Sequence, residues 1–239
     1  MPLSTPPTKQ SSPIFWILAS LAGLAAGYRF FIRPHLKRWG STPAERDQPL
    51  PGDGLIPHPL FETTRAISIH ATASEIWPWL LQMGYRRAGW YSYDSLERLM
   101  GAGDFIEGGS ATRIYPELQH IQPGDLMLSA PGVDWFRVEE LIRDHALVLS
   151  ATMNPFTAGT PGADRHSPIF CGTWTFLLQK INVCTTRLVV RLRASYSPLW
   201  LMKPFMFFFL EPVHFLMEQK MLRNLRTLIE QRPHPAPNA

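Results

Sequence analysis

The sequence predicts an α+β fold in which a curved antiparallel sheet packs against a long C-terminal helix, with a transmembrane helix added at the N-terminus. Apolar and polar residues alternate along several short segments in the middle of the chain, as at 187–193. Between 211 and 231, apolar residues instead recur every three or four positions, which is the helical period. Helical patterns stand at the two ends of the strand region and do not alternate with strands, which favours α+β over α/β.

The transmembrane helix is predicted over residues 14–32, after a Pro-, Ser- and Thr-rich stretch at 1–13 that we expect to be disordered. The segment is apolar apart from Ser20, Tyr28 and Arg29, and about 20 apolar residues are needed to cross a bilayer core. Basic residues cluster directly behind it, whereas a lone lysine precedes it. The positive-inside rule therefore predicts a single-pass protein of the inner (cytoplasmic) membrane, with its folded domain facing the cytoplasm.

Two other readings of this apolar segment stay open. A cleaved signal peptide would be cut near 25–27, but export disfavours the basic cluster that follows. The second alternative is a core helix of a soluble domain. Such a helix usually has one polar, solvent-facing side, whereas this segment is apolar all round, so this alternative is the weaker one.

Residues 33–62 begin with basic side chains and continue with several prolines, which indicates a juxtamembrane segment and a linker that wraps the domain as irregular chain. The folded domain is predicted over 63–231, and a short disordered tail over 232–239.

The domain is expected to start with a strand at 63–69, where Ile67 and Ile69 share one side. A capping box from Thr72 to Glu75 then predicts a helix start, because the threonine hydroxyl and the glutamate carboxylate satisfy free amide groups there.

A second pattern of this kind runs from Asp94 to Glu97 and predicts a short helix that ends at Gly101. Strands are expected to follow, each with one buried and one wet face, and Arg187, Arg191 and Arg193 are assigned to the wet face of the last one. Their alternating patterns lie at 126–128, 136–138, 147–149, 173–178 and 187–193.

A bent sheet with a long helix across its concave face should leave an apolar hollow between the two layers. The chain has eight Trp and fourteen Phe, which suit the walls of such a hollow. We expect these residues to bind an apolar ligand there: Trp90, Tyr93, Trp135, Trp174, Phe176, His214 and Met217.

Several phrases resemble a bacterial, membrane-linked group of uncharacterised proteins within the SRPBCC superfamily, which also holds START domains, birch-pollen-type allergens and polyketide cyclases. The phrases are RWGSTPAE at 38–45, LPGDGLIPHP at 50–59, IWPWLLQMG at 76–84, GWYSYDSLE at 89–97, GTWTFLL at 172–178 and LEPVHFLMEQKML at 210–222. The resemblance covers roughly 38–231 and implies a helix-grip fold that binds a hydrophobic molecule. It implies catalysis in only some branches, so the group lends this chain no activity.

Three residues are candidates for acid or base chemistry: Asp94, His214 and Glu218. His214 and Glu218 are four positions apart and therefore lie on one helix face. The plain alternatives are a helix cap for Asp94 and a hydrogen-bonded core position for His214.

Other classes of function find little support. The formal charge of +4 is modest and lies largely beside the apolar segment, so nucleic acid is not an expected partner. Two cysteines without metal-ligand spacing predict neither a zinc site nor a disulfide framework. The sequence has no G-x-S-x-G, P-loop, G-x-G-x-x-G or H-E-x-x-H motif, and we expect neither metal nor cofactor.

Three hypotheses for function remain, and the third is a structural or regulatory partner with a collapsed pocket. The first is membrane-anchored binding of a hydrophobic small molecule or lipid. The second is a cofactor-independent cyclase, dehydratase or hydrolase that acts on a hydrophobic substrate. The stretch 199–210, LWLMKPFMFFFL, is either the buried start of the long helix or a surface that touches the bilayer, and Lys203, Pro204 and Glu211 argue against a second full span.

Overall fold

The computed structural model describes residues 13–99, 101, 103–130, 133–156 and 167–231 of the chain. The chain divides into two compact units between Leu36 and Lys37. The predicted disordered ends, 1–13 and 232–239, lie outside the described residues apart from Pro13, which starts the first helix.

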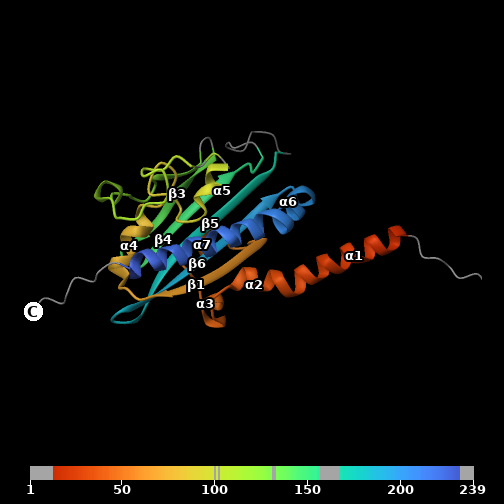
Figure 1. Cartoon of the computed structure of the whole chain (residues 1–239), viewed down its shortest axis with the longest axis horizontal. Coiled ribbons are helices and arrows are strands. Elements are labelled where there is room, and N and C mark those ends of the chain that lie inside the picture. The colour runs from red at the N-terminus through yellow and green to blue at the C-terminus, as the bar shows by residue number, and fades with distance from the viewer. Residues whose placement is uncertain (1–12, 100, 102, 131–132, 157–166, 232–239) are drawn as a thin grey trace, which may run out of the picture. The chain divides into compact units, whose positions relative to one another are not determined.

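The first unit is helical: α1, Pro13–Gly27, continues through a π turn, η1, Tyr28–Ile32, into α2, Arg33–Arg38 (Figure 1). The helix Ile14–Arg38 is long and apolar enough to cross a bilayer, and none of its apolar window is buried inside the protein. Length and composition are the only grounds for this, and a signal sequence would satisfy them equally. The transmembrane assignment therefore stays a prediction.

The second unit is α+β, as predicted, with a six-stranded, fully antiparallel curved sheet in the order β1-β6-β5-β4-β3-β2. Each segment with an alternating pattern is a strand. The strands are β1 Phe61–Ile69, β2 Leu126–Ala130, β3 Val133–Ile142, β4 Ala146–Met153, β5 Ile169–Asn182 and β6 Thr185–Ser197.

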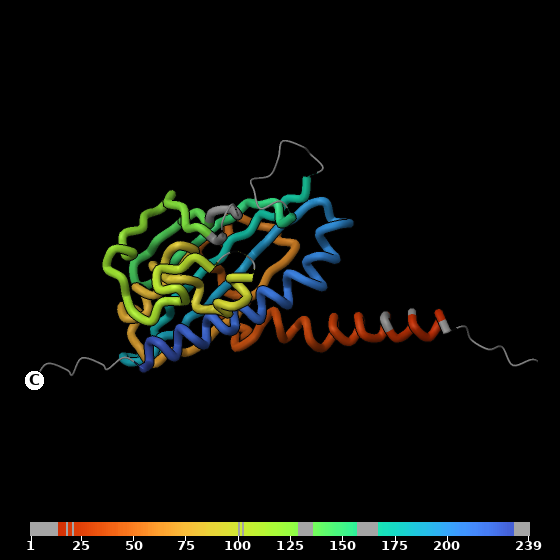
Figure 2. The backbone as a smooth tube through the Cα atoms, turned by 45° about the horizontal axis from the view of Figure 1, so that its top comes forward, coloured from red at the N-terminus to blue at the C-terminus, as the bar shows by residue number. Residues whose placement is uncertain are grey.

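One long C-terminal helix lies across this sheet, and the loop-rich segment 84–125 lies beside it (Figures 1 and 2). It consists of α6, Leu199–Phe205, a π turn η4, Met206–Leu210, and α7, Glu211–Glu230. Pro204 lies inside α6, and the helix continues through it. The π turn directly precedes Pro212, where a wider turn relieves the clash between a proline ring and the carbonyl four residues earlier.

Short helices complete the unit. The capping box at the start of α4 is confirmed, because the Glu75 carboxylate accepts the Thr72 N–H at 2.7 Å. The remaining elements are α3 Pro43–Asp47, η2 Asp53–Leu55, α4 Ala73–Leu81, α5 Asp94–Leu99 and η3 Pro116–Leu118.

The main core lies between the sheet and α7, and a second, smaller core lies on the opposite face of the sheet. The second core consists of Leu50, Ala66, Ala146, Leu177 and Val189. The segment expected to be a linker covers this face and belongs to the compact unit. At Gly40 (φ +72°), a Cβ would approach the Ala66 carbonyl oxygen to 2.1 Å, so only glycine permits this contact.

The expectation of a wet outer face on the last strand is wrong. Arg191 on β6 does point away from α7, but its side chain is 3 % exposed. Its guanidinium donates to the carbonyls of Glu45, Arg46 and Gln48 and to the Asp53 carboxylate at 2.7 to 2.9 Å. The covering segment exposes backbone carbonyls that need donors, and the arginines supply them.

Candidate functional site

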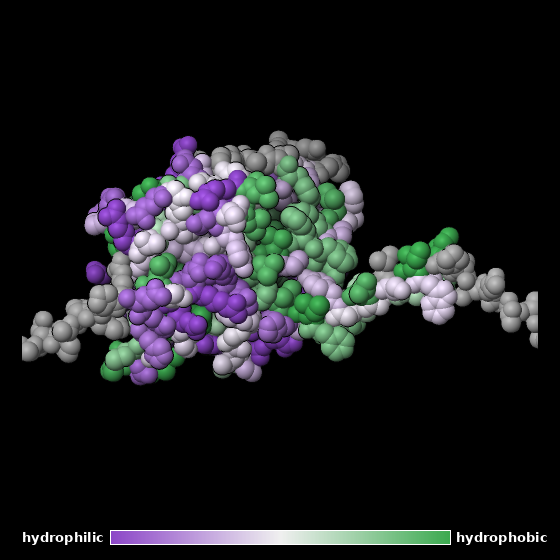
Figure 3. Space-filling view, viewed as in Figure 1, coloured by the Kyte–Doolittle hydropathy of each residue, from purple (hydrophilic) through white to green (hydrophobic). Residues whose placement is uncertain are grey.

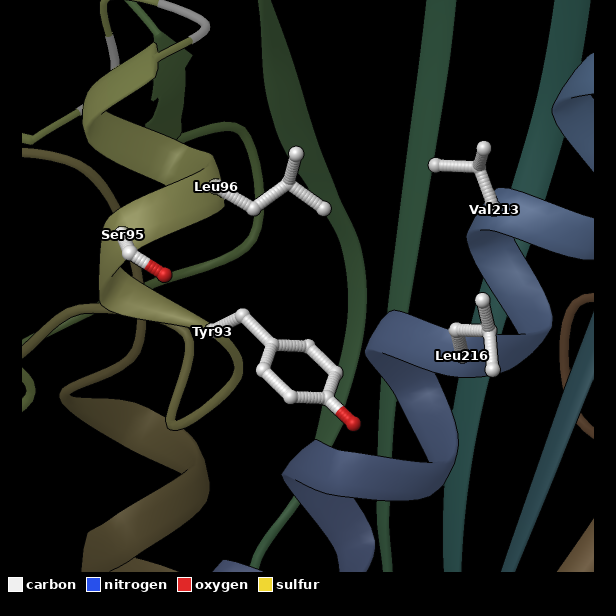
Figure 4. A pocket seen from close by; sticks show the side chains of 5 residues that line it. All are labelled: Tyr93, Ser95, Leu96, Val213 and Leu216. Atoms are coloured by element: carbon white, nitrogen blue, oxygen red, sulfur yellow. The ribbon is translucent and has the colours of Figure 1, made fainter.

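A groove opens on the surface between α5 and α7 (Figure 4). Its volume is about 280 Å³, and its lining is almost wholly apolar. Leu96 of α5 and Val213 of α7 point toward each other across the gap, and strands of the sheet pass behind them. The remaining lining residues are Tyr93, Ser95 and Leu216.

The α5 side of the groove is held to α7 by the segment that precedes α5. The Ser92 hydroxyl donates to the Met217 carbonyl at 3.0 Å, and the Asn224 amide donates to the Tyr91 carbonyl at 2.8 Å. Tyr91 itself has a left-handed backbone (φ 55°), and its hydroxyl accepts a hydrogen bond from Gln82 at 2.7 Å. These bonds pin an otherwise irregular segment and bring Tyr93 to the groove.

The second predicted capping box does not form. Asp94 instead accepts two hydrogen bonds from Ser110, from the hydroxyl at 2.6 Å and from the backbone N–H at 3.0 Å. Neither carboxylate oxygen of Glu97 has a hydrogen-bond partner within the described part of the chain. The Asp94 carboxylate therefore anchors the loop after α5.

Glu97 is the feature of α5 that sequence reasoning missed. Its side chain points into the domain and is 1 % exposed. Burial, and secondly the nearby Asp94 carboxylate, raise the pKa of Glu97 to about 7. A carboxyl group in this setting holds its proton up to near-neutral pH.

A cluster of charged and polar side chains is buried where α7 crosses β1 and β5. Arg65 on β1 donates to the Glu218 carboxylate at 2.8 Å, and both side chains are 1 % exposed. The indole N–H of Trp174 donates to the second oxygen of Glu218 at 3.0 Å. The charge of Glu218 is therefore paired and hydrogen-bonded on both oxygens, as burial of a carboxylate requires.

His214, one turn before Glu218, completes this cluster. Arg65 Nη1 lies 3.1 Å from Nδ1 of the ring, and a guanidinium can only donate, so Nδ1 accepts. Burial lowers the pKa of His214 to about 4, with Glu218 opposing the fall and Arg65 adding to it. The neutral ring then carries its proton on Nε2, which faces Glu218 Oε2 at 3.5 Å.

The predicted aromatic residues meet in one stack inside the domain. The ring centroids of Trp90 and Trp174 lie 5.7 Å apart, and Phe136 lies within 5.6 Å of both. Phe176 is 4.8 Å from Trp174. These rings pack against one another between the sheet and the C-terminal helix.

Of the predicted ligand-binding residues, Tyr93 lines the groove. Trp90, Trp174 and Phe176 lie in the buried stack, and His214 lies in the charge cluster. Met217 is half-buried on α7, and the side chain of Trp135 lies outside the described residues.

The fold and the site define an α+β protein with an apolar surface groove beside a buried charge cluster. No family model and no curated protein matches the chain. Solved structures with a partly similar course include a conserved protein from Geobacillus kaustophilus, with 15 % identity, a TM-score of 0.39 and coverage of 71 % of this chain and 95 % of that one. A hypothetical protein from Helicobacter pylori has 10 % identity, a TM-score of 0.42 and coverage of 75 % and 94 %.

Truncated norcoclaurine synthase from Thalictrum flavum is similar to the same degree, with 12 % identity, a TM-score of 0.38 and coverage of 72 % of this chain and 95 % of that one. At such identities and scores the matches establish neither family nor function. The site is therefore interpreted from its own geometry.

Proposed function

We propose that this chain is a membrane-anchored member of the START-like SRPBCC superfamily that binds a hydrophobic small molecule or lipid in the groove between α5 and α7. The anchor is the helix over 14–32, and the domain faces the cytoplasm. The observation that carries the proposal is the groove itself, which is open to the outside and lined by Leu96, Val213 and Leu216.

The size of the groove limits the ligand. Pockets for small molecules commonly have volumes of about 300–1,000 Å³. A groove of about 280 Å³ is just below this range, so it suits one acyl chain or a compact apolar molecule. The hydroxyl groups of Tyr93 and Ser95 are the polar groups in the lining, and they would orient a ligand that carries one polar end.

Native mass spectrometry of the full-length chain, delipidated and then incubated with a total polar lipid extract, tests this proposal. We expect the wild-type chain to retain one ligand, and Leu96→Arg to lose it because a guanidinium would fill the groove. Leu99→Arg is the matched control, since Leu99 lies on the same short helix and is 82 % exposed outside the groove. Equal uptake by all three chains would contradict the proposal.

The alternative, an acid/base enzyme, has less support in the geometry. A general base needs a lone pair directed at the substrate. Nδ1 of His214 accepts from Arg65, Glu218 is held by Arg65 and Trp174, and Asp94 is held by Ser110. None of the three lines the groove.

A further inference from the structure

The first half of the C-terminal helix carries a row of exposed apolar side chains. We define the apolar stripe as Trp200, Pro204, Phe208, Pro212 and Leu216, which follow one another at intervals of four, so that each lies next to the following one on the helix surface. Trp200 is 78 % exposed and Phe208 is 65 % exposed. At 1.5 Å per residue the stripe is about 24 Å long.

The stripe belongs to a larger apolar area. Its neighbours Leu199 and Phe209 are also more than half exposed. Figure 3 shows hydrophobic residues gathered over the part of the domain where α6 and the start of α7 lie. Contiguous exposed apolar surface of this kind marks a surface that another body covers.

The charges on the same helix indicate what covers it. Between Leu199 and Ile229 the acidic residues are Glu211 and Glu218, and both are buried, with 3 % and 2 % of their surfaces exposed. The basic residues of this range all reach solvent, at Lys203, Lys220, Arg223 and Arg226. Up to Ile229, the accessible surface of the helix thus combines aromatic and aliphatic groups with positive charge alone. Glu230, the last residue of α7, accepts a hydrogen bond from the His70 backbone N–H.

We propose that the apolar stripe lies in the interfacial region of an anionic bilayer, with the helix axis along the membrane surface. Trp, Phe and Leu side chains beside exposed Lys and Arg are the composition of helices that bind in this way. The predicted anchor ends at Ile32, and the compact domain begins at Lys37, so a few residues of chain would keep the domain next to the same membrane.

The stripe also continues into the groove, because Leu216 belongs to both. A domain docked by the stripe would therefore open its groove toward the lipid, and a bilayer-dissolved ligand could enter without crossing water. This last step rests on the function proposed above, whereas the docking itself rests on the exposed stripe and its charges.

A fluorescent label at the stripe tests the docking in the full-length chain. Trp200→Cys and Phe208→Cys, each with Cys171→Ser and Cys184→Ser, are labelled with NBD and reconstituted in nanodiscs of phosphatidylglycerol and phosphatidylcholine. Val183→Cys is the control, because Val183 is 74 % exposed in the hairpin between β5 and β6. We expect doxyl-labelled lipid to quench the stripe labels several-fold more strongly than the control label, and this difference to shrink in purely zwitterionic discs.

Stripe labels that iodide quenches from water as strongly as the control label would overturn the docking. Labels protected from both quenchers would overturn it as well, because a second copy or another protein would then cover the stripe. Either result counts only for discs that contain the chain. Neither result would contradict ligand uptake by the groove, because the Leu96→Arg comparison tests that uptake separately.

Discussion

The two helices that flank the groove each bury a carboxylate, and the two carboxylates are in opposite situations. Glu218 on α7 receives hydrogen bonds from Arg65 and Trp174, whereas Glu97 on α5 has no partner for either oxygen among the described residues. Both are at most 2 % exposed. The comparison shows that burial alone does not determine the setting of a carboxyl group: Glu218 is fixed in an ion-paired, hydrogen-bonded network, whereas the pKa of Glu97 is raised to about 7.

Among the variants considered, removing the Glu218 carboxylate should reduce the free energy of unfolding most. Glu218→Ala removes a buried carboxylate that is hydrogen-bonded to Arg65 and Trp174, and we expect the free energy of unfolding to fall by about 3–5 kcal/mol. Denaturant unfolding of the full-length chain in detergent measures this. Glu117→Ala, at an exposed position of η3, is the control and should stay within about 0.5 kcal/mol of wild type.

The double variant Arg65→Met, Glu218→Leu sharpens the same point. It removes both charges together, so its loss of stability should be much smaller than that of Glu218→Ala. A double variant as unstable as the single one would show that packing at these positions, and not the loss of one partner of the ion pair, causes the effect.

The buried carboxyl group of Glu97 should make the free energy of unfolding depend on pH. The pKa of Glu97 is about 7 in the folded chain and 4.5 as its ordinary value, so between these values the folded state holds a proton that the unfolded state has lost. Stability from this group is therefore fully present below pH 4.5 and is lost as the pH rises through 7. Between pH 5 and pH 8 the free energy of unfolding of the wild-type chain should fall by on the order of 2 kcal/mol more than that of Glu97→Leu.

Unfolding of the two chains at a series of pH values gives this difference directly. For each chain, the change in the free energy of unfolding between two pH values is taken first. A packing effect of the leucine is the same at both pH values and therefore cancels. A constant gap between the two curves from pH 5 to pH 8 would show that Glu97 does not change its protonation on folding.

The smallest loss of stability is expected when one hydrogen-bond donor to Glu218 is removed. Trp174→Phe keeps most of the ring but removes the indole N–H that Glu218 accepts, and we expect a loss of about 1–2 kcal/mol. The same substitution in the Arg65→Met, Glu218→Leu background should cost less, because the acceptor is already absent. Equal losses in the two backgrounds would assign the effect to ring packing.

Local sequence patterns predicted most of the helices and strands. Contacts between residues far apart in the sequence could not be predicted in this way. Alternation identified the strands, and the three-to-four-residue period identified α7. Arg65 escaped attention although it shares the side of Ile67 and Ile69, and that lone charge on an apolar face was the available signal. Its partner Glu218 is 153 positions away, and only the packing of α7 on β1 brings the two together.

The same limit applies to the contacts among the candidate site residues. His214 and Glu218 were placed on one face from their spacing, and they do lie together. The capping box at Asp94 did not form, and the Asp94 carboxylate instead accepts from Ser110, 16 positions further along the chain, which the local pattern could not show. The wet face of β6 was misjudged because the pattern of a strand cannot show that a distant, proline-rich segment will cover it.

The proposed ligand binding at the groove is tested most directly by photo-crosslinking. The full-length chain in nanodiscs is irradiated with a diazirine-bearing fatty acid, and the modified peptides are mapped. The proposal predicts adducts in the peptides that carry Tyr93 to Leu96 and Val213 to Leu216, and their loss in Leu96→Arg but not in Leu99→Arg. Adducts confined to residues 14–32, with the groove peptides unmodified, would contradict it.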